Sequence, residues 1–408
     1  MPDALAIFLG EIRQTRSEVV ALSESNNRIL FSDVTSPDNL PRLAKSTRDG
    51  YAVRVASDGQ NFENLSFRIV GEVRIGTISN LVVEYNEAAK IATGSYVPSG
   101  ANAIVMREYS LLEGSLLKIT KPVRIGENII SPGEDLRKGQ LLLKSGTRLR
   151  PQHIALLSLL GARQAKVFSK PRIAIFSTGD ELKDVRPQST RKSSNDGRAS
   201  TFDSNRPFLS AVIPELGGVP VNLGIARDNF EEIRSKMSQG LKYDALLLSA
   251  GSSVGERDYV SRAAESIKGL RMLVHGVAMR PSSPTGLAVC RGKPVIFLPG
   301  FPTSAIVSFY VFGRPAILRV SGSSSTDMPK IPARIEEDFE GKVGLTHFLR
   351  VRVVRDRELY RAKIIRPIEA QYSSWLKEAN GIALVGADGR TSLKCGDQVS
   401  VYLIGDVE

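Results

Sequence analysis

Short apolar runs alternate with amphipathic segments between Arg172 and Gly313. The segments between the runs have apolar residues at helical spacing, whereas the runs are short and rich in β-branched residues, as buried strands are. The predicted strands are RIAIFST, PVNLGIA, YDALLLSAG and PVIFLPG, and the predicted helices are NRPFLSAVIPELGG, FEEIRSKMSQGL, DYVSRAAESIKG and TSAIVSFYVFG. Strands that alternate with helices predict a mostly parallel sheet covered on both faces.

The rest of the chain has a different pattern. The first twenty residues and the stretch from Ile154 to Phe168 have helical spacing. Between them YAVRVAS, SFRIVGEVRI and LLKITKPVRI alternate apolar and polar residues like half-buried strands. We therefore expect a β-rich insertion between two helical parts of one domain. After the Ser-rich SGSSSTDMP, the segments HFLRVRVVRD, LYRAKIIRP and DQVSVYLI predict a small β-barrel or sandwich.

Neither secretion nor a membrane span is predicted. The N-terminus carries Asp3 and Glu11 and lacks the basic-then-apolar order of a signal peptide. The uncharged stretch from Val295 to Gly313 is interrupted by prolines and polar residues, so we interpret it as strand, loop and helix. The two cysteines, Cys290 and Cys395, form no disulfide framework, which favours a cytoplasmic protein.

Length and charge narrow the class of protein. A chain of 408 residues is expected to form several domains, and 42% hydrophobic with 24% charged residues is typical of a globular protein. The net charge of +12 favours an anionic partner or simply solubility. Nucleic acid is not the expected partner, because we find no zinc finger and no aromatic-rich sheet motif, and there is one Trp.

Three polar loops follow predicted strands, where ligands bind in open α/β sheets. They are STGDEL, SAGSSVGERD and LPGFPTSA. Glycines and a helix N-terminus admit an anion, and carboxylates beside an anion indicate a bridging Mg²⁺. Each loop taken alone is better explained as a turn with solvated charges, whereas the three together favour a site. No loop matches the dinucleotide fingerprint or the GxxxxGK[ST] phosphate loop.

The ordered motifs of the chain resemble those of the molybdopterin molybdenumtransferases, the MoeA family, which is similar to the E domain of gephyrin. STRDGYAV resembles the family signature S-A-M-D-G-Y-A. The resemblance continues over nearly the whole chain, in the family's order, with IATGSYVPSGANAIVMREY, GENIISPGEDLRKGQ, FSTGDEL, FDSNRPFL, SAGSSVGERDY, LPGFPTSA and EANGIALV.

The resemblance implies an elongated homodimer of four-domain chains. Residues 1–44 and 144–169 correspond to a helical domain, and residues 45–143 to a β-rich domain inserted in it. Residues 170–320 correspond to a three-layer α/β molybdopterin-binding domain with a mostly parallel sheet. Residues 327–408 correspond to a C-terminal β-barrel.

The resemblance also implies an activity, the insertion of molybdate or tungstate into adenylylated molybdopterin, with Mg²⁺ required and AMP released. A molybdopterin adenylyltransferase is then a candidate partner, while nucleic acid and membranes are not. The alternative is a molybdopterin-binding or scaffold protein of the same fold with weakened catalysis.

The family pattern assigns site residues. It places Asp49 and Thr93 at the active site, facing the α/β domain of the other subunit, although alone they are an ordinary turn former and a loop hydroxyl. Glu181, Asp228 and Asp258 fall on its catalytic, metal-binding acidic positions. The implied substrate-binding residues are Gly179, Asp180, Asp203, Asn205, Ser249, Gly251, Ser252, Ser253, Gly255, Arg280, Ser283, Pro299, Gly300 and Ser304.

The chain departs from the pattern at the RPSSP motif, where the family usually has K-P-G-K-P. Arg280 keeps the charge of the first lysine and can bind an oxyanion through two N–H groups, whereas Ser283 loses the charge of the second. Arg48, where the family has methionine, is a candidate replacement or a solvated surface residue. Phe301 stands where asparagine or tyrosine is common.

Overall fold

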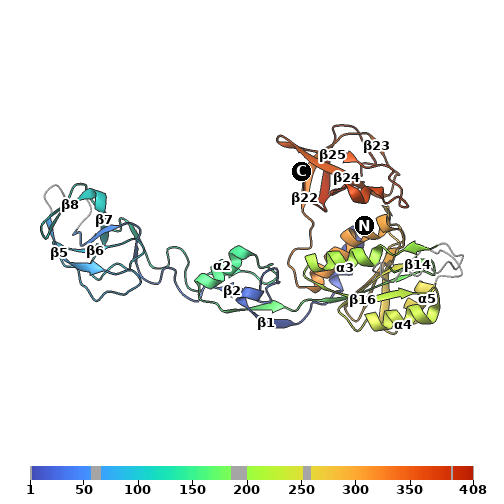
Figure 1. The fold of residues 1–408 in the computed structure, drawn as a ribbon, viewed down its shortest axis with the longest axis horizontal. Helices are drawn as coiled ribbons and strands as arrows, with labels where there is room; N and C mark the ends of the chain where they lie inside the picture. Colours follow the sequence, from blue (N-terminus) through green and yellow to red (C-terminus); the bar gives the residue numbers. More distant parts are fainter. Residues whose placement is uncertain (1, 57–65, 185–199, 251–258, 387–388, 408) are drawn as a thin grey trace, which may run out of the picture. The chain divides into compact units, whose positions relative to one another are not determined.

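The computed structural model in Figure 1 describes residues 2–56, 66–184, 200–250, 259–386 and 389–407. The chain divides into two compact units. The first contains residues 1–32, 145–155 and 163–408, and the second contains residues 33–144 and 156–162. None of the helices in the described ranges has the length and apolar character needed to cross a bilayer.

A six-stranded mixed sheet forms the centre of the first unit. Its first four strands are parallel, as predicted, and the last two form an antiparallel extension that the sequence pattern did not predict. The order is β16 (Val219–Ala226), β13 (Arg172–Thr178), β17 (Ala245–Ala250), β21 (Lys293–Pro299), β20 (Gly286–Cys290) and β18 (Leu270–His275).

Helices cover both faces of this sheet. In β13, Ile173 and Ile175 belong to one hydrophobic core, and Ala174 and Phe176 belong to another, because successive side chains of a strand point to opposite faces. The first core also contains residues of α1 (Pro2–Gly10), α3 (Asn205–Glu215), α6 (Pro302–Ser308) and α7 (Arg314–Val320). The second contains residues of α4 (Phe230–Gly240) and α5 (Tyr259–Glu265). The predicted three-layer α/β architecture is confirmed, and a π-helical turn, Phe309–Gly313, joins α6 to α7.

Two predicted helical segments are partly wrong. The N-terminal helix α1 ends at Gly10, and Ser17–Ala21 form strand β1. The stretch from Ile154 belongs to α2 (Pro151–Leu159) only at its start, and Gln164–Phe168 form strand β12, which pairs with β1. Gly161, at φ +80°, lies between helix and strand, and the burial of residues 164–167 alternates with the period of a strand.

The C-terminal part of the first unit is a closed five-stranded barrel. Of the two predicted alternatives, a β-barrel and a sandwich, the barrel is therefore confirmed. The ring is β24 (Thr346–Asp356), β25 (Leu359–Ile364), β22 (Lys330–Ile335), β28 (Gln398–Leu403) and β26 (Gly381–Val385), which pairs back with β24. The short strand β19 (Met279–Arg280) extends from the α/β part and pairs with β24.

Small elements complete the first unit. They are the strands β23 (Phe339–Glu340) with β27 (Ser392–Leu393) and β14 (Leu182–Lys183) with β15 (Thr201–Phe202), and the 3-10 helices η1 (Leu22–Glu24) and η5 (Ser374–Lys377).

The second unit is rich in strands, as predicted. Its main sheet has the order β7 (Ala103–Met106), β4 (Gly50–Val53), β6 (Glu87–Ile91), β5 (Ser66–Val73), β9 (Leu116–Ile119) and β8 (Ser110–Glu113). Two small pairs accompany it, β3 (Lys45–Ser46) with β10 (Ile129–Ile130) and β2 (Val34–Thr35) with β11 (Leu141–Leu143), together with the 3-10 helix Arg107–Tyr109.

Candidate functional site

Asp49 and Thr93 form a hydrogen-bonded pair in the second unit. They flank the paired strands β4 and β6, in which Gly50 lies opposite Ile91. The Asp49 Oδ1 atom accepts bonds from the Thr93 backbone N–H at 2.8 Å and from the Thr93 hydroxyl at 3.0 Å. These two bonds lower the pKa of Asp49, with a smaller contribution from Arg107. Asp49 is therefore an exposed, ionised carboxylate with a fixed orientation.

Gly50 explains why the chain can present Asp49 at this point. A Cβ atom at Gly50 would lie 1.9 Å from the Val105 carbonyl oxygen in the adjacent strand β7. Only glycine fits so close to a neighbouring backbone. Arg48, the candidate replacement cation, is exposed in the same loop.

In the first unit, the loop after β13 lies against Asp228, which follows β16. The backbone N–H of Asp180 donates to Asp228 Oδ2, and that of Asp228 donates to Asp180 Oδ1, both at 3.3 Å. Partial burial raises the pKa of Asp228, and the charges of Asp180 and Glu181 raise it further. A carboxylate whose charge is disfavoured by its neighbours is suited to binding a cation.

Gly179 gives this loop its shape. Its φ of +151° lies in a region that L-residues rarely adopt, and a Cβ atom there would lie 2.7 Å from a Glu181 carboxylate oxygen. The bend at Gly179 therefore leaves room for the Glu181 carboxylate. Within the described ranges no three His, Cys, Asp or Glu side chains converge as a metal-binding group. The third expected metal ligand, Asp258, lies outside those ranges.

The serine- and glycine-rich loop that follows β17 lies outside the described residues, and of its motif only the strand residues Ser249 and Ala250 are described. Ser249, the next-to-last residue of β17, is buried. The expected substrate-binding residues Gly251, Ser252, Ser253 and Gly255 lie outside the described residues, as Asp258 does.

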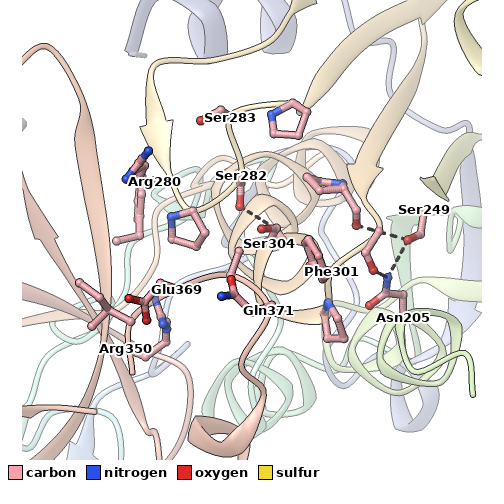
Figure 2. Close-up of a pocket in the computed structure, with 18 of the residues that line it drawn as sticks. Asn205, Ser249, Arg280, Ser282, Ser283, Phe301, Ser304, Arg350, Glu369 and Gln371 are labelled. Carbon is pink, nitrogen blue, oxygen red and sulfur yellow. Dashed lines mark hydrogen bonds between the residues drawn. The ribbon is translucent and has the colours of Figure 1, made fainter. Parts of the chain in front are cut away.

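A cavity of about 820 Å³ lies between the carboxyl ends of the strands and the barrel, within the first unit. Figure 2 shows Arg280, Arg350 and Glu369 toward one side of it and Asn205 and Ser249 toward the other. The expected site residues that line it are Glu181, Asp203, Asn205, Ser249, Arg280, Ser283, Pro299, Gly300 and Ser304. Gly179, Asp180 and Asp228 are not among its lining residues.

The Asp203 carboxylate is used in hydrogen bonds to the start of α3. One of its carboxylate oxygens accepts hydrogen bonds from the backbone N–H groups of Asn205 and Arg206, at the start of α3. The other accepts a bond from the Arg206 guanidinium at 2.5 Å. Asp203 therefore stabilises the N-terminus of the helix that carries Asn205.

The RPSSP motif begins at Arg280, the last residue of β19, and lines the cavity beside the barrel. Arg280 is exposed and lies opposite His347 in the pairing of β19 with β24. The Ser283 hydroxyl donates to the Met279 carbonyl at 2.7 Å, so its proton is already used by the backbone just before the motif. Ser282 has a φ of +92°, and its hydroxyl donates to the Ser304 carbonyl at 2.7 Å, which fixes the motif against α6.

Arg350 is a cavity residue that the sequence analysis missed. It lies on β24 with 1% of its surface exposed, and its Nε atom has no hydrogen-bond partner among the described residues. Burial lowers the pKa of its guanidinium to about 10, and the carboxylate of Glu369 opposes this shift. The group is therefore still positively charged at neutral pH. In sequence, Arg350 looks like any polar residue of an alternating strand, so no local signal distinguishes it.

The barrel that carries this arginine docks on the α/β part. The Trp375 indole N–H donates to the Thr303 hydroxyl at 2.7 Å, and the Thr303 hydroxyl donates to the Tyr372 carbonyl at 2.7 Å. Phe348, two residues before Arg350 on the same strand, belongs to the hydrophobic core of the α/β part. The cavity is therefore walled by two parts of the chain that are far apart in sequence.

Comparisons with known proteins support one family. Residues 1–161 match the family model described as "MoeA N-terminal region (domain I and II)", and residues 174–319 match "Probable molybdopterin binding domain". A molybdopterin molybdenumtransferase of Staphylococcus aureus is 32% identical over 339 residues, covering 82% of this chain and 78% of its relative. The corresponding protein of Staphylococcus epidermidis is 30% identical over 336 residues, with the same coverage.

Solved structures agree with the sequence relatives. The crystal structure of a molybdopterin biosynthesis MoeA protein from Pyrococcus horikoshii has a TM-score of 0.82 and 30% identity, and covers 99% of this chain and 98% of that one. A molybdenum cofactor biosynthesis protein from Pyrococcus furiosus, at 22% identity, has a TM-score of 0.59 with 98% of both chains covered and so shares the fold.

Proposed function

Since the chain belongs to the molybdopterin molybdenumtransferase family, we propose that it inserts molybdate or tungstate into adenylylated molybdopterin and releases AMP. The observation that carries this proposal is the pair of arginines in one cavity, the buried Arg350 with a free Nε and the exposed Arg280. A buried guanidinium beside a second one is suited to an oxyanion or phosphate, because a charge-assisted bond is strong where water is excluded.

The carboxylates near the loop after β13 are proposed to bind the metal ion that the reaction needs. Glu181 and Asp228, with Asp258, would hold Mg²⁺, which fits a site whose like charges raise the pKa of Asp228. The bound ion would neutralise charge on the phosphates while the anhydride bond breaks and AMP leaves. An oxygen from water or from the oxyanion replaces AMP on phosphorus.

Asp49 and Thr93 are proposed to act from a second subunit. They belong to the other compact unit, and their paired geometry presents a fixed, ionised carboxylate at the surface. In a homodimer this carboxylate would complete the partner's site by orienting water or a substrate hydroxyl. Light scattering at working concentration tests this, and a monomer that releases AMP at the full rate would contradict it.

Substrate supply follows from the same chemistry. Because the substrate carries an adenylyl group, an adenylylating enzyme must act immediately before this one, and we propose a molybdopterin adenylyltransferase as the partner. Mixing the two proteins with unmodified molybdopterin, ATP, Mg²⁺ and molybdate should release AMP only when both are present.

The decisive assay uses the purified chain with adenylylated molybdopterin, Mg²⁺ and either oxyanion. AMP release and metal incorporation are expected together, and omission of Mg²⁺ or of the oxyanion should abolish metal incorporation. Comparison of molybdate with tungstate identifies the preferred metal.

One observation favours the alternative, a binding or scaffold protein. The RPSSP segment offers one cation, Arg280, where two lysines are usual in the family, and the Ser283 hydroxyl already donates to the Met279 carbonyl. Tight binding of adenylylated molybdopterin without AMP release would favour this alternative over the transferase.

A further inference from the structure

Asn205, the first residue of α3, is a polar cavity residue that hydrogen bonds hold in place. It lines the cavity and is 6% exposed. Its side-chain nitrogen donates to the Ser249 hydroxyl at 2.6 Å and to the Gly300 carbonyl at 2.9 Å. The bond to Ser249 is drawn in Figure 2. The amide is therefore held from two sides, by β17 and by the loop before α6.

These partners determine which way the amide points. The Gly300 carbonyl can only accept, so the nitrogen of the Asn205 amide must face it. The Ser249 hydroxyl donates to the Pro299 carbonyl at 3.4 Å and therefore accepts from Asn205. Both N–H groups of the amide are used, and a reversed amide would place two oxygens against each other.

The Asn205 Oδ1 atom is left as a buried acceptor. No donor among the described residues reaches it. A buried acceptor without a partner is costly, so a ligand that brings a donor to this point gains more than the bond alone. Pro299, Phe301 and Pro302 line the same cavity, and Phe301 is 53% exposed. Such surfaces suit a flat ring.

We propose that Asn205 Oδ1 accepts a hydrogen bond from an N–H group on the heterocycle of the substrate and so selects an amino-substituted ring. The inference rests on the proposed function and deepens it. The cavity then recognises two poles of one ligand, an amino heterocycle at Asn205 and an anion at Arg280 and Arg350. Either ring of adenylylated molybdopterin, the pterin or the adenine, carries such an amino group.

Binding of ring pairs that differ by the amino group tests the proposal and identifies the ring. Pterin is compared with the same bicyclic ring lacking its exocyclic amino group, and AMP is compared with purine riboside monophosphate. Isothermal titration with the unmodified full chain should show one amino-bearing ligand binding about tenfold or more tightly than its partner. Equal affinities within both pairs, or no binding by either amino-bearing ligand, would overturn the proposal.

Variants then assign the preference to Asn205. In Asn205→Ala the preference should shrink to about twofold or less, while in Gln371→Ala, which removes another amide that lines the same cavity, it should remain. Thermal melting checks that both variants fold. If Asn205→Ala does not fold, the affinities of the unmodified chain for the two ligand pairs still decide the proposal. A preference that survives in folded Asn205→Ala would overturn the proposal.

The outcomes separate this inference from the proposed function. If the chain releases AMP but binds both members of each pair equally, the proposed function stands and the proposed role of Asn205 is wrong. If the chain shows the preference but never releases AMP, the proposed role of Asn205 stands and the transferase activity is wrong.

Discussion

Thr303 accepts a hydrogen bond from the indole of Trp375 at 2.7 Å, and this bond joins the first turn of α6 to the barrel. Trp375 is the single tryptophan of the chain and is 2% exposed. Its fluorescence therefore reports on the contact between the barrel part and α6.

Thr303→Val should loosen this contact. The change keeps the shape of the side chain but leaves the buried indole N–H and the Tyr372 carbonyl without their partner, at a cost of about 1–3 kcal/mol. Urea unfolding followed by Trp375 fluorescence should show a lower midpoint. Thr303→Ser, which keeps the hydroxyl, is the matched control, and equal midpoints for Thr303→Val and the unmodified protein would show that the bond contributes nothing.

Replacing Arg350 by methionine should weaken oxyanion binding about tenfold to a hundredfold, since a charge-assisted bond in a buried site is lost. Methionine is similar in volume, so the melting temperature should stay the same or rise when a buried charge is removed. Titration with molybdate or tungstate measures the affinity. Arg355→Met, an exposed position on the same strand, should bind normally; unchanged affinity in Arg350→Met would remove Arg350 from the site.

Arg280→Ala should raise the apparent dissociation constant for the oxyanion about tenfold or more. Ser283→Lys should strengthen binding or leave it unchanged, because it adds a cation at the cost of one bond to Met279. Titration at low salt is the most sensitive measurement, because screening is least there. Equal affinities of Arg280→Ala and the unmodified protein would exclude Arg280 and favour the scaffold alternative.

Glu181→Gln and Asp228→Asn should slow AMP release about a hundredfold or more if both residues bind the metal. Because the pKa of Asp228 is raised, protons compete with Mg²⁺ at higher pH than at an ordinary carboxylate. The Mg²⁺ concentration for half-maximal rate should therefore rise as the pH falls through that raised pKa, and less so in Asp228→Asn. Glu231→Gln, at an exposed position of α4, is the control. Full activity in both site variants would show that Glu181 and Asp228 do not bind a catalytic metal.

Asp49→Asn should abolish most AMP release without unfolding the chain, because Asp49 is exposed. Thr93→Val keeps the backbone bond and removes the hydroxyl bond, so the pKa of Asp49 should rise toward its ordinary value. A carboxylate needed in its ionised form then loses activity at a higher pH, and the acid limb of the pH–rate profile should move upward. Thr93→Ser should leave the limb in place. An unmoved limb in Thr93→Val would mean that Asp49 does not set it.

The predicted positions were most accurate where a local pattern decides the structure. The strands and helices from Arg172 to Ala250 follow from residue spacing, because a buried strand beneath helices must be apolar on both faces. Prediction was wrong at Ser17–Ala21 and Gln164–Phe168, which form strands only because they pair with each other across the sequence. The antiparallel strands β18 and β20 were also missed, although β20 is joined to β21 by a local hairpin whose turn is Arg291–Gly292, with Cys290 opposite Lys293.

The sequence by itself determined the family, the α/β core with its polar loops, and the departure at Arg280 and Ser283, because these depend on residue type and order. Only the tertiary structure decided that Arg350 is buried in the cavity and that the Asn205 amide turns its oxygen away from Gly300. Burial and amide orientation depend on what packs against a residue. Here the neighbours are Pro367, Glu369 and Trp375 for Arg350, and strand β17 with the loop before α6 for Asn205.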